Sequence, residues 1–522
     1  MKTKISNVRV IDGSGKPAFL GDVGIDWNGR LQVLKPNSGV KAKDELDGTG
    51  LTVTPAFIDA HSHGDLVMSS EYATLSKLNQ GIGTQIAGHC GVSLFPYLQG
   101  DGEEYLRFVS GIAPYPGLPK SAFALESYGS FRDWMESIGN PIDTRCFVGH
   151  GTLRLMAMGY ANRRPDSTEL ERMKAALRRS MREGALGLST GLVYAPCCYA
   201  DNEEILALLR VVAEEGGFYA THPRNEADSV VEARRESLKL AKEAGVPLCV
   251  SHLKAAGRDN WGKPKVCLAD IDAALEEGMK ILIDCYPYTA GNTSLNVSIP
   301  PRYFKKGLKG LLDALDSPTE REIIRLEMER KSDYDNYIYN SGGFSGTYVS
   351  SCPFFHDAEG MFLTDYAKKV GLSPFDAYCD ILIKNQGLGL GIYFHMSEDD
   401  LHTIFAHPRC AVSTDGLIGK EGDNPHPRSF GTMPRAFRFM TEERGICSRE
   451  EAVHRMTGLP AGFFGLRNKG LVRDGYDADL LLIDEAAFAD QASYANGDRL
   501  CSGIVMMFIK GKTVYKENRI CS

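Results

Sequence analysis

The sequence predicts an α/β fold in which eight parallel strands close into a (β/α)₈ barrel. Short apolar runs recur eight times along the 522 residues, and many of them end in a polar residue. Several gaps between these runs carry apolar residues at helical spacing. The two ends of the chain differ from the middle, because they show short alternating runs separated by turn signals. These observations predict a large barrel and a smaller β-rich unit.

The eight apolar runs are the predicted barrel strands. Strands that are apolar on both faces are typical of buried parallel sheets. Eight repeats favour a closed barrel over an open, doubly wound sheet, and chemistry in such barrels lies at the carboxyl ends of the strands. The runs are residues 51–60, 81–90, 144–150, 185–189, 217–222, 247–252, 280–286 and 410–415.

Two of the predicted helices have recognisable starts. Ser167 and Thr168 can cap a helix whose apolar stripe includes Leu170. Asp201, with Glu204 three residues later, resembles a capping box before a second apolar stripe. Both helices fall between predicted strands, as the barrel requires.

The remaining segments predict a second domain and an insertion. Residues 1–54 and 468–522 alternate between short apolar runs and turns, which predicts one small β-sandwich built from both termini. Residues 55–467 then hold the barrel. The stretch 289–409 is much longer than an ordinary connection, so we expect an extra subdomain or lid over the mouth of the barrel.

Composition and charge exclude several classes of protein. Hydrophobic residues make up 43% of the chain and charged residues 24%, which is ordinary for a soluble globular protein. The net charge of −8 argues against a nucleic-acid or anionic-membrane partner. We see no apolar signal region and no run near the ~20 residues that span a bilayer. Thirteen scattered cysteines indicate reduced thiols, so we expect a cytoplasmic enzyme.

Polar residues at the ends of the predicted strands indicate a metal site. His61 and His63 stand two residues apart after the first run, a spacing that turns both imidazoles the same way on a strand. Asp65 follows and looks like part of the same corner. The alternative is a loop with ordinary polar residues. Further metal-type residues end later runs: Cys90, His222, His252 and Asp415.

This set of side chains suggests zinc chemistry. A thiolate with imidazole nitrogens is the ligand set that zinc prefers, and a catalytic zinc keeps a position open for water, whose pKa it lowers to roughly 7. Asp415 ends an apolar strand, so we expect partial burial to raise its pKa and suit it for proton transfer. The alternative is a rim residue in the turn before Gly416.

Nine motifs carry a family resemblance from the first predicted strand to the last. They are residues 54–65, 88–91, 149–154, 184–194, 221–222, 251–254, 284–288, 413–416 and 425–432. With these motifs the sequence resembles the amidohydrolase superfamily and, within it, the D-aminoacylase (N-acyl-D-amino-acid deacylase) family. The His61–His63 pair belongs to the whole superfamily, whereas Cys90 and the His-Pro-Arg sequence at Arg428 are more specific.

The resemblance implies a ligand set. Many amidohydrolases with two metals use a carboxylated lysine at the end of strand four, but the run 183–190 contains no lysine. In the resembled family a cysteine from strand two takes its place. The ligands of one tightly bound Zn²⁺ would be Cys90, His222 and His252. A second, weaker metal position would be lined by His61, His63 and Asp415.

The resemblance also implies a small-molecule substrate, an N-acyl-D-amino acid that is cleaved to a carboxylate and a free D-amino acid. Asp415 would act as base toward water and then as acid toward the leaving amine. Arg428 suits the α-carboxylate, because a guanidinium binds a carboxylate through two parallel hydrogen bonds. Tyr286 and Lys254 are also implied as substrate contacts. Alternatively, Tyr286 only packs in the core and Lys254 is only a solvated surface residue. The further contacts implied are Tyr194 and Asn292, the latter standing where the family usually has serine.

We make separate predictions for the roles of the other histidines and for the amino-acid side chain that the substrate carries. We expect His150 to order the surroundings of the metal and His89 to be structural. Family members selective for acidic side chains carry a basic lid residue. Arg302 could be this basic residue, but Ile299 could occupy the same position instead. We therefore favour an enzyme that accepts neutral side chains or a broad range of them. Surface or packing roles are expected for His356, His395, His402, His407, His426 and His454.

Two alternative functions stay open. The first is ring opening of a cyclic ureide, such as a hydantoin or a dihydropyrimidine, and the missing lysine of strand four counts against it. The second is a non-catalytic scaffold on the amidohydrolase fold. Such scaffolds typically lose metal ligands, whereas every expected ligand is present here.

Overall fold

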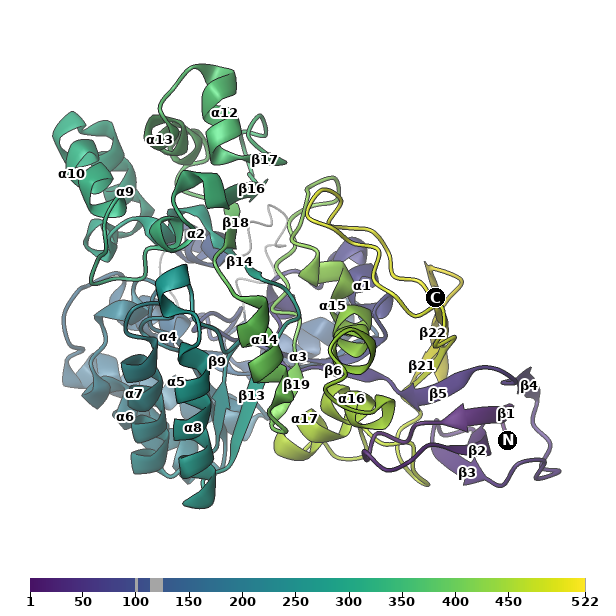
Figure 1. Cartoon of the computed structure of the whole chain (residues 1–522). Coiled ribbons are helices and arrows are strands. Elements are labelled where there is room, and N and C mark those ends of the chain that lie inside the picture. Colours follow the sequence, from purple (N-terminus) through teal and green to yellow (C-terminus); the bar gives the residue numbers. More distant parts are fainter. Residues whose placement is uncertain (99–101, 113–124, 522) are drawn as a thin grey trace.

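The computed structural model describes residues 1–98, 102–112 and 125–521. Parallel strands flanked by helices occupy the middle of the chain, and strands from both termini lie together at one side (Figure 1). Among the described residues, no helix has the length and apolar character needed to cross a membrane.

The parallel strands follow the predicted order, and each predicted run overlaps one of them. Phe147 alone separates β8 from β9, so these two strands form one stretch of chain. The amide of Ala60 donates to the carbonyl of Val412 (3.4 Å), which connects the last strand to the first. Parallel pairing joins β6 (Phe57–Asp59), β7 (Ile82–Ala87) and β8 (Asp143–Cys146). It also joins β9 (Val148–Gly149), β10 (Gly187–Gly191), β11 (Phe218–His222), β12 (Leu248–Val250), β13 (Ile281–Cys285) and β19 (Cys410–Val412).

The first predicted strand is broken into two. β5 (Thr52–Pro55) pairs in the terminal sheet, whereas β6 pairs with β7. The amide of Ala56 donates to the carbonyl of Asp479 (2.8 Å), so the chain leaves one sheet there before it enters the next. His61 and His63 lie beyond the end of β6. The prediction that strand alternation aims these two imidazoles is therefore wrong, and a turn does so instead.

Strands from both termini form one nine-stranded sheet. β5 lies between β1 and β20 and so joins the two ends of the chain. This sheet has its own apolar core, which includes Val23, Leu480 and Phe508. The other strands are β1 (Thr3–Val10), β2 (Phe19–Ile25), β3 (Leu31–Leu34), β4 (Asp44–Asp47), β20 (Leu480–Ile483), β21 (Ile504–Ile509), β22 (Lys512–Lys516) and β23 (Arg519–Ile520).

Helices connect the parallel strands. The predicted start of α5 is one residue late, because the side chain of Asp166 accepts from the Glu169 amide and caps the helix. Asp201 caps α6 as predicted. The helices are α1 (Glu71–Leu78), α2 (Gly102–Ile112), α3 (Tyr128–Ser137), α4 (His150–Met158), α5 (Ser167–Arg182), α6 (Asn202–Glu214), α7 (Val230–Ala244), α8 (Lys263–Glu276), α14 (Glu398–Ala406), α15 (Arg428–Arg438), α16 (Arg449–Met456) and α17 (Gly458–Phe463).

The long stretch between β13 and β19 forms a separate layer, seen at the top of Figure 1. An antiparallel sheet orders its strands β14-β18-β16-β17, and an apolar core of its own includes Leu311, Ile338 and Tyr378. Its elements are β14 (Ala290–Ser294), β15 (Lys305–Lys306), α9 (Gly307–Asp316), α10 (Pro318–Met328), α11 (Tyr337–Asn340), β16 (Thr347–Ser351), β17 (Met361–Phe362), α12 (Leu363–Val370), α13 (Pro374–Lys384) and β18 (Leu390–Phe394).

Candidate metal centre

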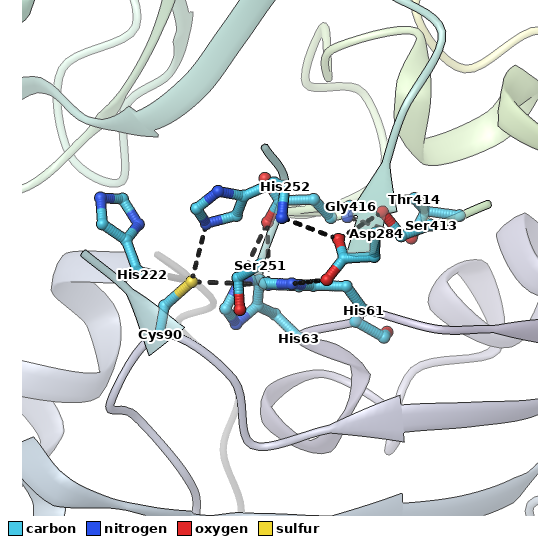
Figure 2. A network of polar contacts seen from close by, with 12 residues as sticks. His61, His63, Cys90, His222, Ser251, His252, Asp284, Ser413, Thr414 and Gly416 are labelled. Carbon is cyan, nitrogen blue, oxygen red and sulfur yellow. Dashed lines mark hydrogen bonds and ion pairs between the residues drawn. The ribbon is translucent and has the colours of Figure 1, made fainter. Parts of the chain in front are cut away.

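Three residues predicted as tight zinc ligands meet in space. Cys90 follows β7, His222 is the last residue of β11, and His252 follows β12. All three are buried, and each offers a ligand atom within 4.8 Å of the others. Cys90 Sγ lies 3.3 Å from His252 Nε2 (Figure 2). Residues separated by more than 160 positions in the chain therefore converge at the carboxyl ends of three strands.

The second predicted group adjoins the first and shares Cys90 with it. Cys90 Sγ lies 3.4 Å from His61 Nε2. Asp415 Oδ1 lies 3.5 Å from His61 Nε2 and 3.2 Å from His63 Nε2. These four residues are buried, and their ligand atoms lie within 4.8 Å of one another. The structure thus brings all six predicted metal-type residues into one cluster.

Three of the six have an unusual backbone. Cys90, His252 and Asp415 have φ angles of 53°, 33° and 45°, in the left-handed region that few residues other than glycine enter, although aspartate and histidine do so more often than most. Each stands two or three residues past the end of a strand, where the chain turns sharply. Such strain persists only where the surrounding structure holds it, and it clusters at functional sites.

Two buried carboxylates orient the histidines of the cluster. Asp284 Oδ2 lies 3.3 Å from His61 Nδ1, which leaves Nε2 of the same ring facing Cys90. Asp284 Oδ1 accepts from the amide of His252 (3.0 Å) and from the hydroxyl of Ser413 (2.8 Å), as Figure 2 shows. Carboxylates that bond the outer nitrogen of a ligand histidine fix its tautomer and ring orientation.

Glu226 is the second carboxylate, and the sequence analysis missed it. Its oxygens lie 3.1 Å from His252 Nδ1, 3.5 Å from His222 Nε2 and 2.9 Å from Lys254 Nζ. Burial works to raise the pKa of Glu226, but His222, Lys254 and His252 hold it well below its usual value. Its position four residues after His222 was the available signal, because it lies in the loop that follows the predicted ligand.

The expectation that burial raises the pKa of Asp415 is wrong. Burial does work in that direction, but the charge of Arg428 and the contacts with His61 and His63 hold the pKa of Asp415 well below its usual value. The guanidinium Nη1 of Arg428 lies 2.9 Å from Asp415 Oδ2. Asp415 is therefore ionised at neutral pH, as a proton acceptor must be.

The predicted substrate contacts line one small cavity of about 20 Å³ beside the cluster. Arg428 stacks on the ring of Tyr286 at 4.5 Å and donates to the carbonyl of Asn292 (2.9 Å). Lys254 Nζ lies 2.8 Å from His252 Nδ1, and Tyr194 packs edge-on to His222. The cavity is also lined by residues that the sequence analysis did not select: Glu226, Gly291, Thr293, Tyr337, His395 and Leu417.

Tyr337 brings the insertion into the site. It begins α11, and its hydroxyl lies 3.4 Å from His222 Nε2 and 3.4 Å from Glu226 Oε2. The sequence pattern of the roughly 120-residue insertion does not distinguish this tyrosine from the others in it. One residue of the insertion therefore contacts a predicted metal ligand.

Other predicted residues lie apart from the cluster. Asp65 accepts from the amides of Gly88 and Leu94, and burial raises its pKa to about 6, so it organises the loop that carries Cys90 rather than joining the ligands. His150 Nε2 lies 2.8 Å from Glu204 Oε1, which keeps that carboxylate from completing a capping box.

Three expectations about packing and specificity have clear outcomes. His89 stacks on the ring of His61 at 3.8 Å, which agrees with a structural role. Arg302 is exposed and paired with Glu327, so it does not face the cavity. His395 is buried against Tyr337 and Tyr393, which agrees with a packing role, and its ring also lines the cavity, which that expectation did not include.

The donor set fits zinc on chemical grounds. Burial raises the pKa of the Cys90 thiol well above its ordinary value, and a nearby dication would reverse this by stabilising the thiolate. Among the described residues, the buried Nδ1 atoms of His63 and His222 have no hydrogen-bond partner. One sulfur with two imidazole nitrogens leaves a fourth position of a tetrahedral site open.

Comparisons with known proteins agree with this geometry. A model of the amidohydrolase family matches residues 44–294. The D-aminoacylase of Alcaligenes xylosoxydans xylosoxydans is 30% identical over 97% of this chain and 93% of its own length. The N-acyl-D-glutamate deacylase of the same organism is 31% identical over 97% of this chain and 92% of its own length. The structure of N-acyl-D-glutamate deacylase from Bordetella bronchiseptica, complexed with zinc and a phosphonate mimic of the tetrahedral intermediate, matches with a TM-score of 0.80 and 29% identity, covering 99% of this chain and 97% of that one.

Proposed function

We propose that this chain, which belongs to the D-aminoacylase family of amidohydrolases, hydrolyses the amide bond of N-acyl-D-amino acids to give a carboxylate and a free D-amino acid. One observation carries the proposal: a thiol and two imidazoles meet beside a buried arginine in a single cavity. The first group suits a metal, and the arginine suits the carboxylate of an amino acid.

The residues present would hold one tight Zn²⁺ and could line a second, weaker position. The tight site would comprise Cys90, His222 and His252. The weaker position would comprise His61, His63 and Asp415. When bound, zinc supplies a Lewis acid that polarises the acyl carbonyl and makes water more acidic. The zinc in the related Bordetella bronchiseptica structure supports this choice of metal.

Asp415 is the proposed proton carrier. As a water oxygen bonds to the acyl carbon, Asp415 accepts a proton from that water. It then returns the proton to the nitrogen of the amino acid while the carbon–nitrogen bond breaks. Its ionised state, held by Arg428 and the two histidines, supports the first half of this role. Its place against His61 and His63 puts it at the metal cluster.

Arg428, Tyr286 and Lys254 are the proposed contacts to the α-carboxylate. All three line the cavity and present hydrogen-bond donors. The cavity of about 20 Å³ holds about one water molecule. A substrate can therefore enter only if side chains of the wall move, and Tyr337 is the part of that wall that α11 of the insertion supplies. Asn292 and Tyr194 complete the wall.

Neutral or broad side-chain specificity remains our proposal. Arg302, the basic residue considered for acidic substrates, is exposed and paired with Glu327 at 2.7 Å. The similarity to a D-aminoacylase and to an N-acyl-D-glutamate deacylase is nearly equal, at 30% and 31% identity. The arrangement around Arg302 therefore supports the choice more than the overall similarity does.

The experiment that tests the proposal combines metal analysis of the purified protein with a stereo-paired panel of N-acetyl amino acids. We expect about one tightly held zinc per chain and turnover of D but not L compounds. Ring opening of hydantoins without turnover of N-acetyl-D-amino acids would replace the proposal with the cyclic-ureide alternative. A protein with neither metal nor amidase activity would point to a scaffold.

Three finer features of architecture and location are part of the proposal. The series of parallel strands, linked from β19 back to β6, supports a closed (β/α)₈ barrel over residues 55–467 with an insertion at about 289–409. The separate core of the terminal sheet supports a β-sandwich built from residues 1–54 and 468–522. All thirteen cysteines are free thiols, which supports a cytoplasmic location.

A further inference from the structure

His395 has buried polar atoms that the protein itself does not satisfy. The residue follows β18, is 2% exposed, and neither ring nitrogen has a hydrogen-bond partner among the described residues. Buried imidazole nitrogens normally bond to something, so two unpartnered atoms in one ring call for an explanation. Because the ring lines the cavity, a bound molecule can supply the missing partner.

The backbone and neighbours of His395 hold the ring in place. Its carbonyl accepts from the amide of Gly257 (2.8 Å) and from Trp261 Nε1 (3.1 Å). The ring packs against Tyr337 and lies parallel to Tyr393. The imidazole is therefore a fixed part of the wall, and its orientation does not depend on its own polar contacts.

The space in front of Nε2 exists because residue 291 is glycine. A Cβ atom on Gly291 would lie 2.9 Å from His395 Nε2 and 3.7 Å from Tyr286 Oη. Gly291 itself lines the cavity. The imidazole and the phenol therefore face the same small opening on β14, next to the stacked guanidinium of Arg428.

Two cations border this opening, each beside a carboxylate: Arg428 lies 2.9 Å from Asp415, and Lys254 lies 2.9 Å from Glu226. Burial, with the charges of Lys254 and Arg428, outweighs the opposing effect of Glu226 and lowers the pKa of His395 to about 3. The ring is therefore neutral and carries one N–H donor. We propose that His395 contacts the substrate by donating an Nε2–H hydrogen bond to the α-carboxylate in the space that Gly291 leaves open. This inference rests on the proposed function and adds a substrate-binding residue to it.

The test compares an N-acetyl-D-amino acid with its α-carboxamide, which lacks the negative charge, using the zinc-loaded enzyme. We expect His395→Phe to lower kcat/KM for the carboxylate about 10- to 100-fold, mainly through KM, and to change the carboxamide at most about threefold. His395→Gln, which keeps a hydrogen-bond donor, should retain part of the preference for the carboxylate over the carboxamide. Gly291→Ala keeps the imidazole but should also reduce this preference, because the new methyl group fills the opening.

Controls separate binding from folding. His402→Phe, at an exposed position of α14, should leave both substrates unchanged. Zinc content should match the wild type for His395→Gln and for Gly291→Ala. The melting temperature should match for His395→Gln and fall for Gly291→Ala, because the new methyl group crowds the imidazole. An equal loss with both substrates, or a loss that follows the amino-acid side chain instead of the carboxylate, would overturn the inference.

Failure of the proposed function gives a different result. In that case the wild type turns over neither compound. Calorimetric binding of the same two compounds to wild type and His395→Phe then decides on His395. A carboxylate preference that the variant lacks would support the contact, and equal binding by both proteins would refute it.

Discussion

Replacing Glu226 by glutamine isolates the effect of one buried charge on the metal site. The carboxylate contacts His252 Nδ1 at 3.1 Å and Lys254 Nζ at 2.9 Å, and it lies 3.4 Å from Arg234 Nη2. Glutamine keeps the shape but removes the negative charge between these groups. It also offers an amide whose donor atoms can face Lys254, which leaves the buried cation without its partner.

The magnitude follows from these contacts. Losing a carboxylate behind a ligand histidine typically weakens metal binding ~10- to 100-fold, or about 1.4 to 2.8 kcal/mol. Breaking a buried ion pair by removing one partner costs about 3 to 5 kcal/mol of folding stability. We therefore expect Glu226→Gln to lose zinc to a chelator at 10- to 100-fold lower concentration, and its melting temperature to fall.

The assay is a chelator competition with bound zinc measured by atomic spectroscopy. Glu214→Gln serves as the control, because Glu214 pairs with Arg178 at an exposed position of α6 and should alter zinc affinity less than threefold. A Glu226→Gln protein that binds zinc as tightly as the wild type would show that Glu226 does not set the orientation of His252.

The remaining predictions concern the proton carrier, the metal and a buried pair outside the site. Asp415→Asn should lower kcat by ~10²- to 10⁴-fold while zinc content stays near normal, because the tight ligands remain; near wild-type turnover would remove Asp415 from the mechanism. Cys90→Ser should lose the tight zinc and most activity, and chelated wild type should recover activity when zinc is added; full activity of the zinc-free protein would contradict this. His150 is buried, which lowers its pKa, but its contacts with Cys197 and Glu204 outweigh burial and raise the pKa to about 9. Since the folded pKa exceeds the unfolded value of about 6.5, this contribution, on the order of 3 kcal/mol, is complete below pH ~6.5 and is lost as pH rises through 9. Melting temperature should fall over that range in the wild type but not in His150→Gln, and equal slopes would refute the assignment.

Much of the parallel-strand framework could be predicted because its signals are local. Each predicted run overlaps a strand, and ligand types such as Cys90 and His252 stand two or three residues past strand ends. The carboxyl ends of parallel strands meet at one edge, so residues remote in sequence could be expected to converge. The break at Ala56 was not predictable, because its amide bonds to Asp479, more than 400 residues away.

The missed features depend on long-range packing. Tyr337 and His395 reach the site through an insertion whose fold leaves no periodic signal at either residue. The direction of the pKa shift at Asp415 depended on the placement of Arg428, which burial arguments alone do not include. The cap of α5 at Asp166 was missed by one residue, which is ordinary for a helix end.

Cys90, His252 and Asp415 have a left-handed backbone that glycine would adopt more easily. At these positions, substitutions that improve thermal stability therefore conflict with catalysis. Glycine would relieve about 1 to 2 kcal/mol of torsional cost at Cys90 and less at His252 and Asp415, whose residue types enter this region more readily, and would delete a ligand or the proton carrier each time. A mutant library screened only for survival on heating should therefore collect inert proteins at these three codons. Homologues that no longer need the reaction could therefore gain stability by acquiring glycine at these positions, and they would lose catalysis in doing so.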